Sequence, residues 1–220
     1  RPWWLQAKKG KEELIMARDT QSIVKMSRRE GYALHPKAVK YLARRSTVPG
    51  QHGRTVRKNV GQYNLQLREK QKVKRLYGLL EKQFARLMVE ASRTKGQSGT
   101  ALLQFLEQRM DNAVYRAGFS TSRRGARQLV THGHFMVNGR RVDVPSIRLR
   151  VGDEIELRSA SKNNEYFKRL DEVSPGGNES SLSWLVVDRK KVAFKVTGTP
   201  TREEAEPEIQ EQLIVEYYSR

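Results

Sequence analysis

The chain has 220 residues, of which 43 are Lys or Arg and 24 are Asp or Glu, and its formal net charge is +19. It contains no cysteine, which excludes a disulfide framework, a thiolate metal site, a thiol nucleophile and an iron–sulfur cluster. The longest apolar runs fall far short of the roughly 20 residues that a membrane helix needs, so no membrane partner is expected. Clustered cations repel one another until phosphates neutralise them, and the charge therefore predicts a polyanionic partner.

The charge is unevenly distributed along the chain. Residues 1–95 carry a net +17, residues 96–160 carry +4 and residues 161–220 carry −2. Every basic residue of the middle segment is arginine, the side chain that suits bidentate phosphate contacts and stacking on bases. A role in solubility or in general membrane binding predicts no such change of cation type.

The first 15 residues are expected to lie outside the mature protein. Met16 opens a Met-Ala-Arg sequence, and the Lys-Glu-Glu at residues 11–13 can be encoded by codons that spell a purine-rich ribosome-binding site just before it. We interpret residues 1–15 as a translated upstream region. The alternative, a short charged helical extension anchored by Trp3 and Trp4, stays open.

Residues 16–95 are predicted to form a basic, mostly helical lobe. A turn-forming loop, Pro-Gly-Gln-His-Gly at residues 49–53, separates two basic stretches. Apolar residues then recur at spacings of three and four, which predicts one long helix over residues 65–92. Few acidic residues are available to pair with its cations, which favours a surface that faces phosphate.

The best lobe boundary is the glycine-rich segment at residues 95–99. Thr100 is a plausible N-cap for a helix with an apolar stripe that ends at Gly118. Ser122 is expected to cap a second helix, from Arg123 to about His132. At 100° per residue, its arginines occupy one arc and its apolar residues the adjoining arc.

After this second helix the sequence period changes to that of β-strands. Asn138 and Gly139 between two short strand-like runs predict a hairpin with a type I′ turn. Further strands are expected at residues 146–151, 154–158, 184–187 and 192–196, and a last one at residues 213–218. The predicted second lobe, residues 96–200, thus combines helices with a small sheet, and the tail at 201–220 is expected to pack back on the first lobe. The fold class is α+β: a mostly helical basic lobe and an RNA-binding lobe of two helices on a small β-sheet.

At this point the chain resembles a known family. The blocks that carry the likeness are Ser27-Arg28-Arg29-Glu30-Gly31, Pro49-Gly50-Gln51-His52-Gly53, Leu106-Glu107-Gln108-Arg109, Ser122-Arg123, Ala126-Arg127-Gln128-Leu129-Val130, His132-Gly133-His134, Val137-Asn138-Gly139-Arg140-Arg141-Val142 and the ending from Pro207 to Arg220. Together they are similar to the small-subunit ribosomal protein S-four family of bacterial type, from about Met16 to Arg220. The arginine-containing module at about residues 106–170 is less specific alone, since tRNA synthetases and pseudouridine synthases carry a similar one.

The resemblance implies a structural constituent of the small ribosomal subunit. It implies a primary binder of small-subunit (16S-type) rRNA that nucleates assembly of the subunit body and contributes to translational accuracy near the path by which mRNA enters. The implied partners are that rRNA, ribosomal protein S-five and other small-subunit proteins, with the protein's own mRNA as a further candidate. The implied location is the cytoplasm, in the ribosome of a bacterium, with an organelle ribosome as the alternative.

Many members of that family hold zinc through cysteines near the N-terminus. In this chain Val24 and Ser27 stand at two of those places, so neither a metal nor another cofactor is expected. His132 and His134 flank a glycine, but no third ligand lies at a matching interval. We prefer a loop role with an RNA hydrogen bond for them, and for His52, over a purely structural role.

The candidate RNA-binding residues combine cations, loop histidines and the hairpin. They are Arg28, Arg29, Arg44, Arg45, His52, Arg57, Lys58, Tyr63, Arg68, Lys70, Lys72, Arg75, Lys82, Arg116, Ser122, Arg123, Arg124, Arg127, His132, His134, Asn138, Gly139, Arg140 and Arg141. Double-helical RNA is recognised chiefly by shape, phosphates and 2′-hydroxyls, which suits arginines and a close-approaching hairpin backbone.

No catalytic residue is expected. The chain has no phosphate-binding Gly-rich loop, nucleophile elbow or paired-carboxylate spacing, and Asp111 is more simply a structural hydrogen-bonding residue. An RNA-modifying enzyme would need a catalytic domain for which no residues remain. A free regulatory or chaperone-like RNA binder is the third hypothesis, and it would not need the long basic segment before residue 95.

Overall fold

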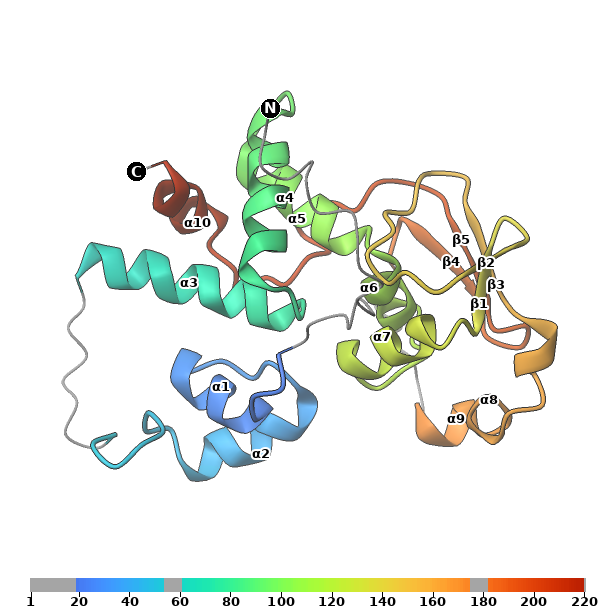
Figure 1. Ribbon diagram of the computed structural model, residues 1–220, viewed down its shortest axis with the longest axis horizontal. Coiled ribbons are helices and arrows are strands. Elements are labelled where there is room, and N and C mark those ends of the chain that lie inside the picture. The colour runs from blue at the N-terminus through green and yellow to red at the C-terminus, as the bar shows by residue number, and fades with distance from the viewer. Residues whose placement is uncertain (1–18, 54–60, 175–181, 220) are drawn as a thin grey trace, which may run out of the picture.

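The computed structural model describes residues 19–53, 61–174 and 182–219 and combines helices with one antiparallel sheet (Figure 1). The α+β class predicted from the sequence is confirmed. The helices are α1 (Ile23–Glu30), α2 (Pro36–Arg44), α3 (Gln62–Leu76), α4 (Glu81–Arg93), α5 (Ser98–Glu107), α6 (Met110–Arg116), α7 (Arg123–Thr131), α8 (Glu165–Lys168), α9 (Leu170–Val173) and α10 (Glu211–Tyr218). The strands are β1 (Phe135–Val137), β2 (Arg140–Val142), β3 (Glu154–Leu157), β4 (Leu185–Asp188) and β5 (Ala193–Val196).

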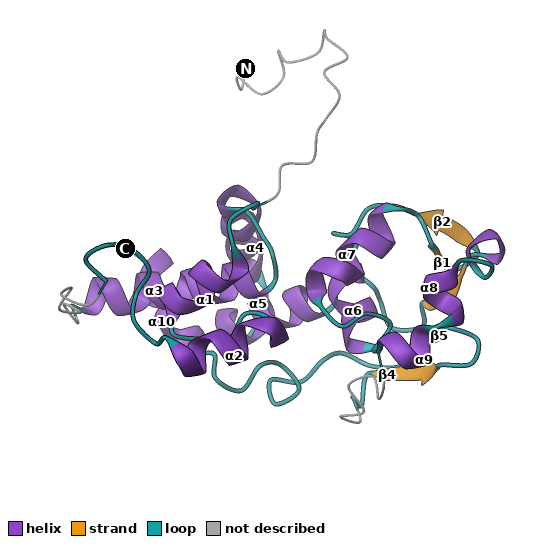
Figure 2. Ribbon diagram, turned by 90° about the horizontal axis from the view of Figure 1, so that it is seen from below, coloured by secondary structure: helices purple, strands orange, loops and turns teal. Residues whose placement is uncertain are grey.

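Two hydrophobic cores divide the molecule into two lobes, which lie side by side along its longest axis (Figure 2). The helical lobe buries side chains of α1, α3, α4, α5 and α10, and the sheet lobe buries side chains of α6 to α9 and of the strands β1, β3, β4 and β5. The change of core falls between Leu106 and Met110, not at the glycine-rich segment before α5. The reason is that Leu102, Leu103 and Leu106 of α5 enter the helical core against α4 and α10.

Two long helices predicted from periodicity are wrong, because each is interrupted. Gly78 has φ +66° between α3 and α4, and the amide of Leu79 donates to the carbonyl of Lys74, which ends the first helix. Apolar residues continue through this break, so spacing alone could not reveal it. Similarly, α5 starts at Ser98, not after a Thr100 cap, and the amide of Met110 turns to Ile147 instead of continuing α5.

The sheet has the strand order β2-β1-β3-β5-β4. The β1–β2 hairpin pairs Val137 with Arg140 across its turn, and Asn138 and Gly139 have φ +49° and +75°. Both positive angles confirm the predicted type I′ turn. The predicted strand at residues 146–151 is wrong: its amides and carbonyls bond to the α5–α6 break, as in Leu149 to Gln108, instead of a neighbouring strand.

The last predicted strand is also wrong, because residues 211–218 form helix α10. Its β-branched residues favoured a strand, but packing against α3 and α5 buries Ile214 and selects the helix. The segment before α10 runs from β5 in the sheet lobe back across to the helical lobe (Figure 1). Within the described ranges, no helix is long and apolar enough to cross a membrane.

Candidate nucleic-acid interface

Helix α7 forms where the sequence predicts it. The hydroxyl of Ser122 accepts a hydrogen bond from the Gly125 amide at 3.2 Å, which caps the helix. Ala126 and Val130 are fully buried in the sheet-lobe core, so the arginines lie on the remaining arc. Their surroundings differ strongly from one another, and that difference decides what each can bind.

Arg123 is enclosed by the protein. Its Nε donates to Asn112 Oδ1 at 2.9 Å and its Nη2 to Glu206 Oε1 at 2.7 Å, and only 13% of the side chain is exposed. The guanidinium also lies 5.0 Å from the ring centroid of Tyr77 and 4.6 Å from that of Tyr115. Two guanidinium nitrogens of Arg123, Nε and Nη2, are thus bonded inside the fold. Its contact with phosphate stays a prediction.

Arg116 is likewise enclosed by the protein. Its Nε and Nη2 donate to the carboxylate of Glu107 at 2.9 and 2.8 Å, and Tyr77 and Asn112 donate to that carboxylate at 2.6 and 2.7 Å. Its side chain is only 10% exposed. A buried carboxylate and a buried guanidinium are tolerable only as a pair that is hydrogen-bonded on every side, so Arg116 belongs to the fold and not to the outer surface.

These contacts join the two lobes. We call the interlobe network the set Tyr32, Tyr77, Glu107, Asn112, Arg116, Arg123 and Glu206. Tyr32, Tyr77 and Glu107 belong to the helical lobe, Asn112, Arg116 and Arg123 to the sheet lobe, and Glu206 to the returning segment before α10.

The protonation states of the network follow from its burial and charges. Burial alone would raise the pKa of Glu206, but the charge and hydrogen bond of Arg123, with smaller effects of Arg116 and Tyr32, hold that pKa below its ordinary value. Burial, and then the Glu107 carboxylate, raise the pKa of the Tyr77 hydroxyl well above its ordinary value. At neutral pH, Glu206 is thus an anion and Tyr77 a neutral donor.

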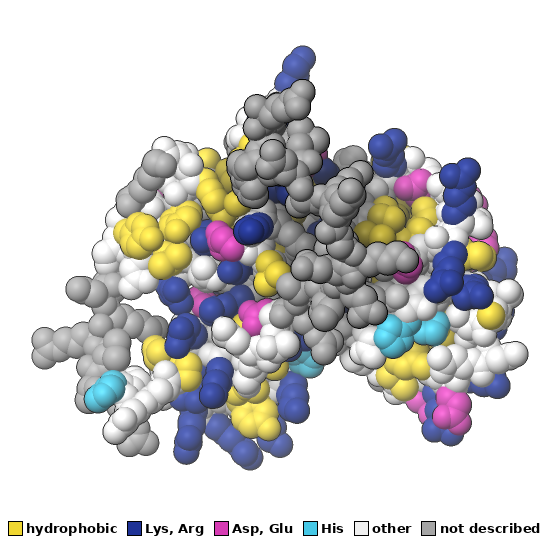
Figure 3. Space-filling view, viewed as in Figure 1, with side chains coloured by type: hydrophobic (Ala, Val, Ile, Leu, Met, Phe, Trp, Pro, Cys, Tyr) yellow, Lys and Arg dark blue, Asp and Glu magenta, His cyan; other side chains and the backbone are white. Residues whose placement is uncertain are grey.

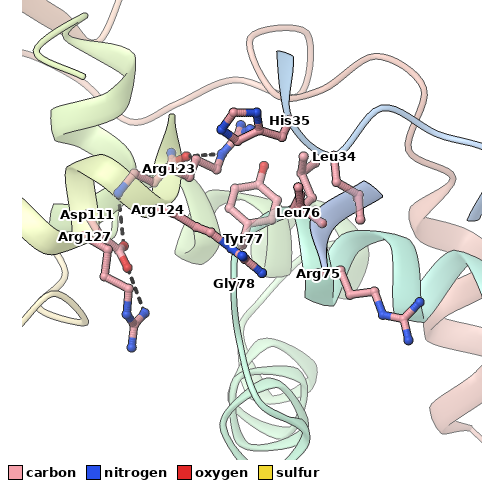
Figure 4. Close-up of a pocket in the computed structure, with 12 residues that line it drawn as sticks. Leu34, His35, Arg75, Leu76, Tyr77, Gly78, Asp111, Arg123, Arg124 and Arg127 are labelled. Carbon is pink, nitrogen blue, oxygen red and sulfur yellow. Dashed lines mark hydrogen bonds and ion pairs between the residues drawn. The ribbon is translucent and has the colours of Figure 1, made fainter. Parts of the chain in front are cut away.

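A small cavity separates α7 from the loop before α2 (Figure 4). It has a volume of about 40 Å³ and is lined by Arg123, Arg124, Arg127, Arg75 and His35 among others. That volume holds a few waters and is far below the size of a site for a nucleotide. Any RNA contact in this region must therefore be made at its rim.

Two of these lining arginines differ in availability. Arg127 donates to Asp111 Oδ2 at 3.1 Å (Figure 4). Asp111 also pairs with Arg109. Arg124 is exposed, and its Nη2 reaches only the backbone carbonyls of Asp19 and Gln21, at 3.4 and 3.5 Å. Arg124 is the arginine of α7 whose charge no acidic side chain of the described residues neutralises.

The hairpin presents further cations. Arg140 and Arg141 are exposed and form no ion pair with any described residue, and no atom lies within 4 Å of a Cβ added at Gly139. Asn138 is committed elsewhere: its amide group donates to Asp153 at 2.8 Å and accepts from the Glu154 amide at 3.0 Å. The hairpin is thus clamped to β3 through Asn138, while its two arginines remain available.

One histidine of this lobe, His134, has a lowered pKa. His134 bonds through Nδ1 to Ser161 at 3.0 Å, and burial, then His132 and Arg158, lower its pKa. His132 is exposed, with its ring centroid 6.0 Å from that of His134. Burial, then Arg124 and Lys37, also lower the pKa of His35, which the sequence analysis did not select and which caps α2. Among the described residues, no group of three acidic or histidine side chains could hold a metal.

In the helical lobe, the candidates on α3 are largely engaged. Arg68 and Arg75 pair with the buried Glu30, whose pKa is raised by burial against the lowering effect of both arginines. Lys70 is buried beside Glu81 and the ring of Tyr217. Lys72 likewise pairs with Glu69 and bonds a tail carbonyl. All four were predicted to face phosphate. In the structure, each instead has an acidic partner within the chain.

The remaining candidates of this lobe are exposed. Arg29, Arg44, Arg45 and Lys82 are exposed and form no ion pair within the described ranges, and Arg28 bonds only to Thr47. Figure 3 shows Lys and Arg side chains gathered over α1 and α2. Tyr63 and His52 are exposed as well. Arg57 and Lys58, together with residues 1–15, lie outside the described residues.

Comparison with known proteins matches both lobes. The family described as "Ribosomal protein S4/S9 N-terminal domain" matches residues 18–107, and the "S4 domain" family matches residues 108–155. The chain is 50% identical over 211 residues to the small ribosomal subunit protein uS4 of Herpetosiphon aurantiacus, covering 93% of this chain and all of that protein. It is 49% identical over 209 residues to the uS4 of Chlorobaculum tepidum, with the same coverage. The chain belongs to the uS4 family.

The boundary between the two uS4 family matches coincides with the change of hydrophobic core after α5. The family is recognisable from the sequence, but the interlobe network is not. Glu107 and Glu206 are about 100 residues apart, and Tyr32 carries no periodic signal. Tyr77 belongs to the apolar spacing that predicted a long helix, and that spacing does not reveal its polar role. The one available hint was a carboxylate, Glu107, directly after the apolar stripe of α5, where a buried acid needs a cationic partner.

Proposed function

We propose that this chain is a non-enzymatic structural protein of the small ribosomal subunit that binds small-subunit rRNA. Its uS4 relatives are named as proteins of that subunit. The observation that carries the proposal is the set of exposed cations, on α1, α2, α7 and the hairpin, that have no acidic partner among the residues that the structure describes. Unpaired surface arginines in both lobes are suited to phosphates of one folded RNA, because each gains a counterion only when RNA is bound.

The finer proposals come from the family resemblance. They are early binding to the rRNA that nucleates assembly, a contribution to accuracy near the path by which mRNA enters, contacts with ribosomal protein S-five and other small-subunit proteins, and binding to its own message. The compartment proposed with them is the cytoplasm of a bacterium. Sedimentation of a cell extract tests the central role: co-migration with the small subunit supports it, and a predominantly free pool favours a regulatory RNA binder.

Three of the arginines proposed to contact phosphate lie on the sheet lobe: Arg124, Arg140 and Arg141, which we call the exposed arginine set. Replacing all three by Gln is expected to weaken binding to a small-subunit rRNA transcript. The slope of log affinity against log salt should fall by up to about 3, roughly one per lost phosphate contact. Filter binding across a salt series measures both quantities.

A matched control removes the same charge elsewhere. Lys168, Arg169 and Lys190 are exposed on α8, directly after it and in the β4–β5 turn, and none is a proposed contact. Their triple Gln variant should lower affinity slightly with little change of slope. Equal effects of the two triple variants would mean that net charge alone attracts RNA and would contradict the assigned contacts.

A further inference from the structure

We propose that Arg123 and Glu206 are positioning residues that fix the angle between the two lobes, so that cations of both lobes meet one RNA in a preset arrangement. The inference rests on the proposed rRNA-binding function. Sequence reasoning assigns Arg123 to phosphate contact, but its geometry indicates a different task.

Glu206 links the lobes through its two oxygens. Oε1 accepts from Arg123 Nη2 at 2.7 Å, and α7 belongs to the sheet lobe. Oε2 accepts from the hydroxyl of Tyr32 at 3.2 Å, directly after α1 in the helical lobe. A change in the angle between the lobes must therefore stretch one of these two bonds.

The segment that carries Glu206 is itself anchored at both ends. Toward the sheet lobe, Glu204 accepts from the Ser183 amide at 2.6 Å. Toward the helical lobe, Ala205 and Ile209 are buried in its core, and the Gln210 amide donates to Glu69 at 2.9 Å. Glu206 thus lies on a segment that is attached to the sheet lobe at one end and to the helical lobe at the other.

A second carboxylate, that of Glu107, also links the two lobes. Glu107, at the end of the helical core, receives hydrogen bonds from Tyr77 of its own lobe and from Asn112 and Arg116 of the other. Arg123 connects the contacts of the two carboxylates, because it bonds both Glu206 and Asn112, which itself bonds Glu107. Directional, charge-assisted bonds in a water-poor junction resist rotation more than apolar contacts do.

This arrangement matters for RNA binding because exposed cations lie on both lobes. A folded RNA that spans the two lobes has fixed phosphate positions, and a hinged protein would lose rotational freedom on binding. A preset angle removes that entropic cost. Arg123 would then support affinity without touching a phosphate.

The test is whether removing a negative charge weakens RNA binding instead of strengthening it. Glu206→Gln keeps the side-chain shape but removes one negative charge, which by electrostatics alone should strengthen RNA binding. Our proposal expects the opposite: affinity for a small-subunit rRNA transcript falls about three- to tenfold, with the salt slope unchanged. Glu203→Gln is the matched control, an exposed glutamate on the same segment, and it should leave affinity unchanged or slightly higher.

The lobe angle can be measured directly in the RNA-free protein. Because the chain has no cysteine, Gln83→Cys on α4 and Asn163→Cys beside α8 give two exposed labelling sites, one per lobe, without changing the charge. Single-molecule energy transfer should give one narrow distance distribution in this pair, and Glu206→Gln should broaden it. Tyr32→Phe removes only the link to the helical lobe and provides a milder second variant if Glu206→Gln folds poorly.

The two proposals fail separately. If the unaltered chain does not bind the rRNA transcript at any salt concentration, the proposed function is wrong, and the distance measurement still tests the lobe angle. Higher affinity of Glu206→Gln, or an unchanged distance distribution in both Glu206→Gln and Tyr32→Phe, would overturn the positioning role. A salt slope lowered by about one in Arg123→Gln would show that Arg123 contacts phosphate after all, because the slope counts the cations that neutralise phosphates.

Discussion

One arginine of the interlobe network, Arg123, and one of the exposed arginine set, Arg124, are adjacent in sequence, yet their environments are opposite. Arg123 is held by a carboxylate, an amide and two aromatic rings, whereas Arg124, the next residue, reaches only backbone carbonyls within the described part of the chain. A cation that already has a buried anion contributes to the fold, and one that lacks an anion can contribute to binding. Charge counted along the sequence cannot separate the two, because both kinds add equally to +19.

Among substitutions of these arginines, that of Arg116 is expected to lower stability the most. Arg116→Met leaves the carboxylate of Glu107, whose side chain is 1% exposed, without its cation. The free energy of unfolding should fall by about 3–5 kcal/mol, measured by urea denaturation. Arg169→Met, an exposed arginine, is the control and should change it by less than about 0.5 kcal/mol. Similar small losses in both variants would remove the distinction between buried and exposed arginines.

The hairpin that carries Arg140 and Arg141 provides the next test. Gly139→Val places a β-branched residue at φ +75°, where space is open but the backbone conformation is disfavoured. Stability should fall by about 1–2 kcal/mol, with weaker RNA binding because the two arginines lose their fixed positions. Gly139→Asn tolerates positive φ and should recover most of both losses. Thermal unfolding of Gly139→Val that matches the unaltered chain would count against the strained turn.

The Ser122 cap of α7, the helix that carries Arg123 and Arg124, is expected to have a smaller effect on stability. Ser122→Ala removes the acceptor of the Gly125 amide and should cost about 1 kcal/mol of stability. Ser122→Thr retains the cap oxygen and should lie close to the unaltered chain. Chemical denaturation resolves the difference. If Ala and Thr behave alike, the cap bond does not stabilise the helix on which Arg123 and Arg124 lie.

The smallest expected effect is the acid dependence of Glu206. Its pKa is lower in the folded chain than its ordinary value of 4.5, so its stabilising contribution is present above that value and is lost as the pH falls through the folded pKa. The stability difference between the unaltered chain and Glu206→Gln should therefore shrink as the pH is lowered from about 5 to about 3. A difference that stays constant over this range would show that the charge of Glu206 does not stabilise the junction.

The sequence by itself determined the features that depend on near neighbours. The cap at Ser122, helix α7, the Asn138-Gly139 turn and the β4–β5 pair were all predicted, because each depends on local backbone preferences and side-chain period. The family was also recognisable from blocks of sequence. Periodicity failed where tertiary contacts override it: at Gly78, where an apolar run hides a helix end, and at residues 213–218, where packing on α3 makes a β-branched segment helical.

Only the tertiary structure decided which cations are available to a partner. Of the arginines predicted on one arc of α7, Arg123 and Arg127 have acidic partners, and Arg124 does not. The partner of Arg123, Glu206, lies 83 residues away in the chain. An ion pair depends on distance in space and on exclusion of water, and neither quantity is written in residue order.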